Sequence, residues 1–299
     1  MSNELAPHLA IALRHASAGT TDTRIPRVEL SVGSASEGKT PCLYRSMICF
    51  ILQGSKRIAI GDTLLSYDSA QYFISALDLP LIGQILDAGS ERPYVAVSLM
   101  LEPALLAELA ATMPPEGESD TKGMGVVINP MTAPLRETLL RLLSLLDSPG
   151  DIPVLAPMIE RELLYRLLRG PQGRLLRQIA RPDGALDRVR RAVTWIRDHA
   201  YETLRTKALC EASGMSRASL HRHFQAMTGF SPLQYQKQLR LQEAHRLLLS
   251  GSHSASDAAF AVGYESASQF GREYRRQFGT PPARHVRQMR QVIGQPLAR

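Results

Sequence analysis

Short apolar runs separated by turn residues occupy much of the first third of the chain. Between Pro41 and Glu102 these runs are Cys49–Leu52, Arg57–Ile60, Thr63–Tyr67, Tyr72–Ile74 and Pro93–Leu101. Residues 53–56, Q-G-S-K, and the pair Gly61-Asp62 have the composition of turns. Strands at this spacing, with turn residues between them, predict a β-sandwich or a small barrel.

The apolar spacing changes to steps of three and four after Pro103, which predicts helices. Two leucine-rich stripes result, one of Leu135, Leu139, Leu142 and Leu146, the other of Ile159, Leu163 and Leu167. Two interpretations stay open for these stripes: packing inside the chain, or a seam that joins two copies. Glycine- and proline-containing segments, 170–173 and 181–184, then bracket an expected linker region.

Beyond this region every pattern is helical, and part of it is repeated. The helices are expected at residues 187–200, 207–212, 216–227, 232–249, 255–262 and 266–278. Three pairs of residues are each 50 positions apart, Ser216 with Ser266, Phe224 with Tyr274 and Pro232 with Pro282. A fixed offset with only two copies indicates one small structural unit used twice.

Each copy reads as a short helix, a turn containing Gly, and a second helix opened by Ser. Gly214 fits a left-handed C-cap, while Ser216 and Ser266 fit N-caps. This is the helix-turn-helix arrangement, in which the second helix enters the major groove of DNA. The helix between the copies, opened by Ser231-Pro232, would span about 27 Å at 1.5 Å per residue. That length is comparable with the roughly 34 Å of one duplex turn, so two recognition helices would reach successive grooves.

Positive charge is concentrated in the repeated part. Residues 1–182 carry 17 Lys and Arg against 19 Asp and Glu, whereas residues 183–299 carry 18 against 9. A basic excess confined to one portion is typical of a domain that binds a polyanion. Two alternatives are a generally solvated basic surface and a helical module that binds only protein.

The β-rich portion lacks the residues of a catalytic site. It has no histidine between His15 and His199, which argues against a cupin-type metal site and against Ser-His-Asp or Cys-His catalysis. We therefore expect no enzyme, no cofactor and no catalytic metal, the alternative being a cupin-type metalloenzyme fused to a helical domain. Cys42, Cys49 and Cys210 form neither a disulfide framework nor a zinc spacing. Without a long apolar run or a signal-peptide pattern, we expect a cytoplasmic protein that does not span a membrane.

The repeated part resembles the double helix-turn-helix domain of the AraC/XylS transcriptional regulators. The family pattern is matched from about Leu186 to Arg287, at positions that include Leu209, Gly214, Leu220, Gly229, Ser231-Pro232, Ala259, Val262-Gly263-Tyr264, Phe278-Gly279 and Pro281-Pro282. The resemblance implies base contacts by Ala218, His221 and Arg222 in the first recognition helix and by Ala267, Ser268 and Arg272 in the second. Arg217, Gln225 and Arg275 resemble phosphate neighbours. Cys210 stands where the family usually has Ala, a substitution that a buried Cys fills easily.

The N-terminal part is similar to the effector-binding, cupin-like β-domain of one AraC branch. The similarity lies in P-C-L-Y-R-S, C-F-I-L-Q-G-S-K-R, D-L-P at residues 78–80 and E-R-P-Y-V-A-V. It implies a small-molecule sensor, with RNA polymerase as a further partner of the whole regulator. Cys42, expected in a polar loop with Arg45 three residues on, is the candidate for effector or redox sensing, because a nearby cation favours a thiolate. Cys49, in an apolar run, is expected to lie in the core.

These observations predict an α+β protein in three parts. Residues 1–109 are expected to form a cupin-like β-barrel, residues 110–182 a helical dimerisation region with a linker, and residues 183–299 an all-α double helix-turn-helix domain. The expected function is sequence-specific binding to double-stranded DNA by a transcriptional regulator that responds to a small molecule or an electrophile.

Overall fold

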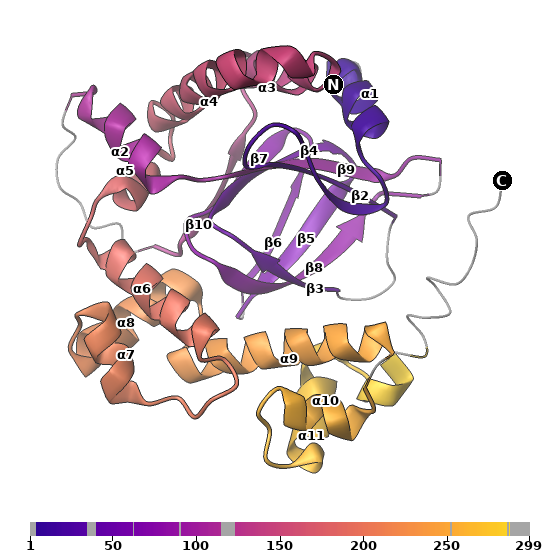
Figure 1. Ribbon diagram of the computed structural model, residues 1–299, viewed down its shortest axis with the longest axis vertical. Helices are drawn as coiled ribbons and strands as arrows, with labels where there is room; N and C mark the ends of the chain where they lie inside the picture. Colours follow the sequence, from indigo (N-terminus) through magenta and orange to yellow (C-terminus); the bar gives the residue numbers. More distant parts are fainter. Residues whose placement is uncertain are drawn as a thin grey trace. The chain divides into compact units, whose positions relative to one another are not determined.

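The computed structural model describes residues 4–34, 40–61, 63–89, 91–114, 123–251, 253–285 and 287. The chain forms two compact units. Unit 1 comprises residues 1–190 with 226–229, and unit 2 comprises residues 191–225 with 230–299. Unit 1 combines sheets with helices, whereas unit 2 is all-helical (Figure 1). The predicted α+β class is therefore confirmed.

Two antiparallel sheets form the centre of unit 1. The first has the strand order β1 (Gly19–Asp22), β2 (Val28–Gly33), β9 (Tyr94–Met100), β4 (Met47–Gln53), β7 (Gln71–Ser75) and β10 (Val126–Pro130). The second has the order β3 (Thr40–Tyr44), β8 (Leu79–Leu86), β5 (Ser55–Ile60) and β6 (Thr63–Asp68). Among the described strands no hydrogen-bonded ladder joins the two sheets, so they do not make the single closed barrel that we expected.

The core of unit 1 lies between these sheets. The ring of Tyr67 on β6 stacks on Phe73 of β7 with centroids 5.4 Å apart, and Tyr44 of β3 meets Phe73 edge-on at 5.2 Å. The central strand β4, M-I-C-F-I-L-Q, is buried from Met47 to Leu52. Its near-continuous apolar run follows from burial on both faces, since helices cover the side of the sheet that faces away from the core.

Five helices complete the described part of unit 1: α1 (Ala6–His15), α2 (Pro103–Ala111), α3 (Ala133–Ser144), α4 (Ile152–Leu168) and α5 (Gly173–Ala180). Figure 1 shows α1, α3 and α4 along one side of the six-stranded sheet. No single described helix is long and apolar enough to cross a membrane. Two 3-10 turns, η1 (Leu145–Asp147) and η2 (Pro149–Asp151), lie between α3 and α4. Within the same residues only α3 with η1 and α4 with η2, bent by 114° at the short break, together reach that length and composition.

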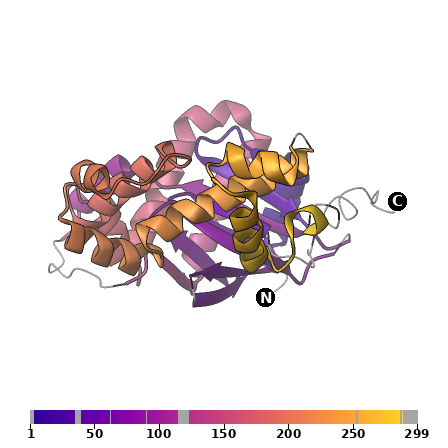
Figure 2. The same ribbon diagram turned by 90° about the horizontal axis from the view of Figure 1, so that it is seen from below.

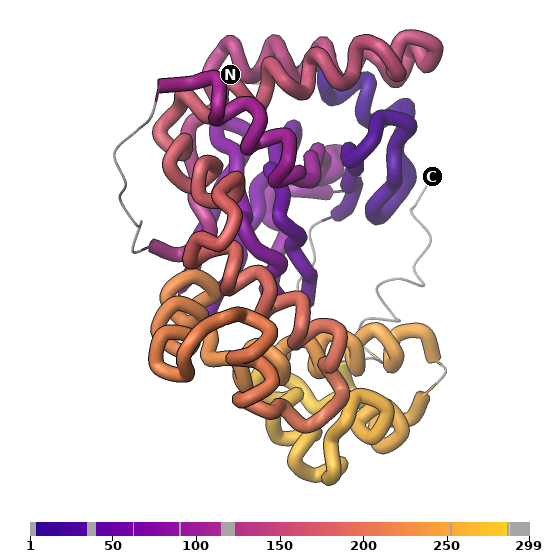
Figure 3. Tube along the Cα trace, turned by 60° about the vertical axis from the view of Figure 1, so that its left-hand side comes forward, coloured from indigo at the N-terminus to yellow at the C-terminus, as the bar shows by residue number. Residues whose placement is uncertain are grey.

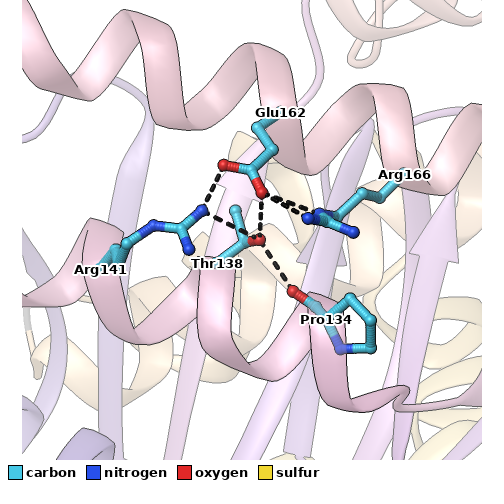
Figure 4. Close-up of polar contacts among 5 residues, drawn as sticks. All are labelled: Pro134, Thr138, Arg141, Glu162 and Arg166. Atoms are coloured by element: carbon cyan, nitrogen blue, oxygen red, sulfur yellow. Dashed lines mark hydrogen bonds and ion pairs between the residues drawn. The ribbon is translucent and has the colours of Figure 1, made fainter.

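The two leucine-rich stripes pack inside the chain. Leu139 on α3 is 1% exposed, and Leu163 and Leu167 on α4 are fully buried. A polar cluster joins the same helices: Glu162 of α4 accepts hydrogen bonds from Arg141 of α3 and, at 2.7 Å, from Arg166 (Figure 4). These hydrogen bonds lower the pKa of Glu162. The leucines of both stripes are therefore covered within the chain, whereas Ile159 is half-buried, and self-association of the helical region stays a prediction.

Several elements of unit 1 escaped the sequence analysis. Helix α1 and strands β1, β2, β3, β8 and β10 were not expected, and β10 lies in a segment where only helices were predicted. The expected linker region contains α5, whose Leu175, Leu176 and Ile179 are buried. The limits of the three predicted parts, 1–109, 110–182 and 183–299, stay a prediction.

Unit 2 follows the expected helical order closely. Helix α6 (Ala185–Asp198) crosses from unit 1 into unit 2. It is followed by α7 (Thr206–Ser213), α8 (Arg217–Thr228), α9 (Pro232–Ser250), α10 (Ala255–Ala261) and α11 (Ala267–Phe278). The long helix α9 runs between the group formed by α7 and α8 and the group formed by α10 and α11 (Figures 2 and 3).

The predicted caps of unit 2 are confirmed. Gly214 ends α7 with φ of 64° in the left-handed region, as a C-cap residue without a Cβ can do readily. Ser231 caps α9 in a capping box with Gln234, and Pro232 occupies the first turn. Ser266 caps α11 by accepting a hydrogen bond from the backbone of Gln269.

Candidate nucleic-acid interface and effector site

The two helix-turn-helix copies superimpose along the sequence as expected. Helices α8 and α11 both have 12 residues and begin at Arg217 and Ala267, 50 positions apart. The predicted core faces are buried in both copies, since Leu220 and Phe224 are fully buried and Phe270 and Tyr274 are 1% and 0% exposed. The same four-residue spacing therefore fixes which face of each recognition helix stays outside.

The structure places the predicted DNA contacts on those outer faces. Eight of the nine residues are exposed, namely Arg217, Ala218, His221, Arg222, Gln225, Ser268, Arg272 and Arg275, and Ala267 is half-buried. Arg222 and Arg272 occupy equivalent positions on α8 and α11. The Arg222 guanidinium lies 3.3 Å from Nε2 of His223, its neighbour in the same turn. Each recognition helix thus presents a small residue near its start and an Arg on the same exposed side.

An acidic residue on α11 is held by neighbouring donors. Glu273 accepts hydrogen bonds from Lys237 of α9 at 2.8 Å, from the Tyr264 hydroxyl at 2.8 Å and from Gln269 at 3.2 Å. Although burial opposes its charged form, these donors lower the pKa of Glu273 below the usual range. Its negative charge is therefore compensated on the protein by Lys237.

Arg240 of α9 connects the two copies. Its guanidinium donates to the carbonyls of Ala200 at 2.7 Å and Glu202 at 2.7 Å, both in the segment between α6 and α7. It also donates to the carbonyl of Gly263, at the turn between α10 and α11, at 2.8 Å. Gly263 has φ of 82°, and a Cβ there would lie 2.4 Å from the carbonyl oxygen of Tyr201. The backbone of the second turn is thus in direct contact with the segment that leads into the first copy.

The environment of Cys42 differs from the one predicted. Cys42 lies in strand β3, not in a loop, and its thiol donates to the carbonyl of Leu81 at 3.7 Å. Arg45 forms an ion pair with Glu29, so it is not the cation beside the thiol. Burial raises the pKa of Cys42, an effect that the nearby Lys56 only partly opposes. The thiol is consequently less reactive than the sequence suggested, because the thiolate is the nucleophile.

Potential metal ligands are dispersed over the described part of the chain. In these residues no cluster of three or more His, Cys, Asp and Glu side chains has the arrangement to hold a metal ion. His8 instead makes a 2.8 Å hydrogen bond with the carbonyl oxygen of Arg136, and His15 pairs with Asp147 at 2.7 Å.

Known structures share this fold across most of the chain. An apo form of a ToxT variant from Vibrio cholerae superposes with a TM-score of 0.56 at 11% identity, covering 90% of this chain and 98% of ToxT. A wild-type ToxT from the same species, bound to an unsaturated fatty acid, gives a TM-score of 0.54 at 10% identity, covering 87% and 94%. At such low identity the likeness concerns the fold alone.

Sequence relatives are found among transcriptional activators. The chain is 31% identical to the HTH-type transcriptional activator RhaS of Salmonella arizonae over 158 residues, which are 52% of this chain and 55% of RhaS. RhaS of Salmonella paratyphi B is 30% identical over 156 residues, 51% of this chain and 54% of RhaS. The chain thus spans about half the length of the curated relatives it matches.

Family comparisons cover both units. Residues 209–288, a range that includes α8 and α11, match a helix-turn-helix domain family. Residues 24–175, half of the chain, match the family described as the AraC-type transcriptional regulator N-terminus, and with both matches the chain belongs to the AraC-type transcriptional regulators.

Proposed function

We propose that this protein is a sequence-specific regulator of transcription that binds double-stranded DNA through two recognition helices, α8 and α11. The observation that carries the proposal is the repeated exposed face, with Arg222 and Arg272 at equivalent positions on two helices that α9 holds apart. Arg pairs bidentately with guanine, and a small residue near the start of a helix permits close approach to base edges. Arg217, Gln225 and Arg275, at the margins of these faces, fit phosphate contacts.

Salt dependence tests this proposal. A preferred duplex would first be selected from a random pool with the full chain, and its affinity then measured at increasing salt. Log affinity should fall with log salt by about 0.9 for each phosphate that is neutralised. Arg275→Ala should weaken binding to every duplex and reduce the slope by about 1.

The matched control is Arg14→Ala in unit 1, where the exposed Arg14 of α1 pairs with Asp147 at 2.5 Å. This control should leave the slope unchanged. A wild-type affinity that hardly varies between low and moderate salt would contradict the proposal and favour a helical module that binds only protein.

We propose that unit 1 receives a small-molecule effector. Its two facing sheets enclose aromatic side chains and Cys42, and the fold is shared with a ToxT protein that carries a bound fatty acid. Cys42 is proposed to contact the effector non-covalently, since its raised pKa disfavours reaction with an electrophile.

Membership of a family of transcriptional regulators supports a non-catalytic role, contact with RNA polymerase, and a place in the bacterial cytoplasm, where chromosomal DNA lies.

Self-association is proposed through the outer side of α4, in place of the leucine stripes. Val154 and Met158 are 66% and 62% exposed, and Tyr165 is 40% exposed. With Arg161 these positions follow steps of four, three and four, the spacing of a short coiled-coil seam. Met158→Glu should shift the full chain from dimer to monomer in sedimentation. Leu64→Glu, a charge placed at another exposed leucine of unit 1, should leave a dimer. A wild-type monomer, or a Met158→Glu dimer, would remove this part of the proposal.

A further inference from the structure

Gly271 is an unusual residue for the middle of a recognition helix. It is the fifth of the twelve residues of α11, A-S-Q-F-G-R-E-Y-R-R-Q-F. Glycine in the interior of a helix lowers stability relative to alanine, because it loses more conformational entropy on folding. The other glycines described in unit 2, Gly214, Gly251, Gly263 and Gly279, all have a positive φ, which glycine adopts most readily. Gly271 is helical and has no such backbone reason.

Packing does not explain Gly271 either. A Cβ placed on it would meet open space, since no atom of the described residues lies within 4 Å beyond its chain neighbours and the adjoining backbone of its own helix. Gly263 is the opposite case, because a Cβ there would lie 2.4 Å from the carbonyl oxygen of Tyr201. The described part of the chain therefore has room for a methyl group at position 271, and this room is open to a molecule that approaches α11 from outside.

The neighbours of Gly271 on the surface of α11 are the predicted DNA contacts. Residues three and four positions apart are neighbours on a helix. Four predicted contacts lie at these distances or directly beside Gly271, namely Ala267, Ser268, Arg272 and Arg275. On α8 the equivalent residue, 50 positions earlier, is His221, which is itself an exposed predicted contact. Gly271 thus lies in the middle of the surface that α11 is proposed to present to DNA.

The other side of α11 is held against α9. Glu273 accepts a hydrogen bond from Lys237 at 2.8 Å, and Gln238 donates to the side-chain carbonyl of Gln277 at 3.0 Å. At about 100° per residue, Glu273 lies about 200° around the helix axis from Gly271. A group added at position 271 therefore narrows the space between α11 and DNA, because the contacts with α9 oppose a shift of the helix.

We propose that the 5-methyl group of a thymine occupies the place of the missing side chain at Gly271, and that Gly271 thereby selects thymine beside the guanine read by Arg272. This role rests on the proposed DNA-binding function and adds a specificity-determining residue to it. The thymine methyl is the apolar group among the donors and acceptors of the major groove, and it has the size of an alanine Cβ. On α8 the side chain of His221 fills the equivalent place, so the half-site read by α8 should lack this preference.

A methyl exchange between protein and DNA tests the proposal. The preferred duplex of the full wild-type chain would be selected from a random pool. Each thymine of that duplex would then be replaced, one at a time, by deoxyuridine, which lacks only the 5-methyl group. One replacement, beside the position that Arg272→Ala relaxes, should weaken wild-type binding about four-fold, the contribution of a buried methyl group.

Gly271→Ala supplies the methyl group from the protein instead. It should bind the thymine duplex at least about five-fold more weakly than the wild type does, because two methyl groups then compete for one space. On the deoxyuridine duplex its affinity should return to that of the wild type on thymine, because its Cβ fills the space that the base leaves. His221→Ala, at the equivalent position of α8, is the matched control and should weaken binding to both duplexes by the same factor.

A stability measurement separates lost DNA contact from lost folding. The urea midpoint of unit 2 should rise by about 0.2–1 M in Gly271→Ala, since alanine favours the helix. A lower midpoint would show that the glycine serves the protein's own packing, and would overturn the proposal.

Two binding results would also overturn it. One is wild-type affinity of Gly271→Ala for the thymine duplex. The other is coupling between Gly271→Ala and deoxyuridine at no thymine of the selected site, or only at a thymine far from the position that Arg272→Ala relaxes. A wild-type chain that selects no duplex refutes the DNA-binding proposal itself, whereas one that selects a duplex without methyl coupling refutes only the role of Gly271.

Discussion

Arg240→Met should lower the free energy of unfolding of unit 2, because Arg240 links the two helix-turn-helix copies by hydrogen bonds. The substitution keeps an apolar stem of similar length but removes three hydrogen bonds, to the carbonyls of Ala200, Glu202 and Gly263 at 2.7, 2.7 and 2.8 Å. A hydrogen bond from a charged donor contributes about 1.5–3 kcal/mol when buried. Arg240 is half-buried, so we take about 1 kcal/mol for each bond, and the free energy of unfolding of unit 2 should fall by about 3 kcal/mol. That loss is a large fraction of the roughly 5–15 kcal/mol typical of a folded domain.

The chain carries a natural probe for this measurement. Trp195 is the single tryptophan and belongs to unit 2, where its ring stacks on His199 with centroids 4.2 Å apart. Urea unfolding of the full protein, followed by Trp195 fluorescence, therefore reports on the unit that Arg240 holds together. Arg240→Lys, which keeps the charge but not the planar fork, should lie between Met and wild type.

Arg246→Met is the matched control on the same helix. Among the described residues its guanidinium pairs only with Glu243 at the surface, with 67% of the Arg side chain exposed, and surface pairs contribute about 0–1 kcal/mol. If Arg240→Met and Arg246→Met shift the urea midpoint by the same small amount, Arg240 does not join the two copies.

Three further predictions concern single groups. Burial lowers the pKa of His245 to about 4, so between about pH 6.5 and 4 the unfolded chain binds a proton that the folded chain does not. The free energy of unfolding of unit 2 should therefore fall by up to about 3 kcal/mol over this range. His245→Leu should remove this pH dependence, and His221→Gln, at an exposed site, should retain it. Gly263→Ala should destabilise unit 2 in urea, because its Cβ meets a carbonyl at 2.4 Å, whereas Gly271→Ala, with open space around it, should be tolerated. Cys42 should be alkylated by iodoacetamide more slowly than a free thiol, and fast modification in the folded protein would contradict its raised pKa.

The helices of unit 2 could be predicted from the sequence because the residues that define them lie close together along the chain. Cap residues such as Gly214 and Ser231, and apolar residues four apart such as Phe270 and Tyr274, act within one or two helical turns. The recognition faces then follow from helix geometry alone. What the sequence could not show is Arg240, since its three acceptors are backbone carbonyls 23 to 40 residues away.

Unit 1 was harder because its sheets depend on pairing between distant segments. Lys56 was assigned to a turn, since Q-G-S-K has turn composition, but only Gly54 lies between β4 and β5, and Lys56 points between the sheets. A glycine such as Gly83 commonly indicates a turn, but Gly83 lies within β8. A Cβ at this position would crowd the side chains of Lys56 and Cys42. The pattern R-L-L-R-Q-I-A of α5 is amphipathic and could have been recognised as a helix, but the neighbouring Gly and Pro residues outweighed it.

The most direct test of the account is the sequence preference of two variants, Arg222→Ala and Arg272→Ala. Binding sites would be selected from a random DNA pool by the full wild-type chain and by each variant. Since an Arg that reads guanine contributes about 1–3 kcal/mol of discrimination at one base pair, each variant should relax one position. The two relaxed positions should lie roughly one helical turn apart, as two recognition helices in successive grooves require. Relaxation of the same base pair by both variants, or an unchanged preference in both, would show that α8 and α11 are not two independent readers.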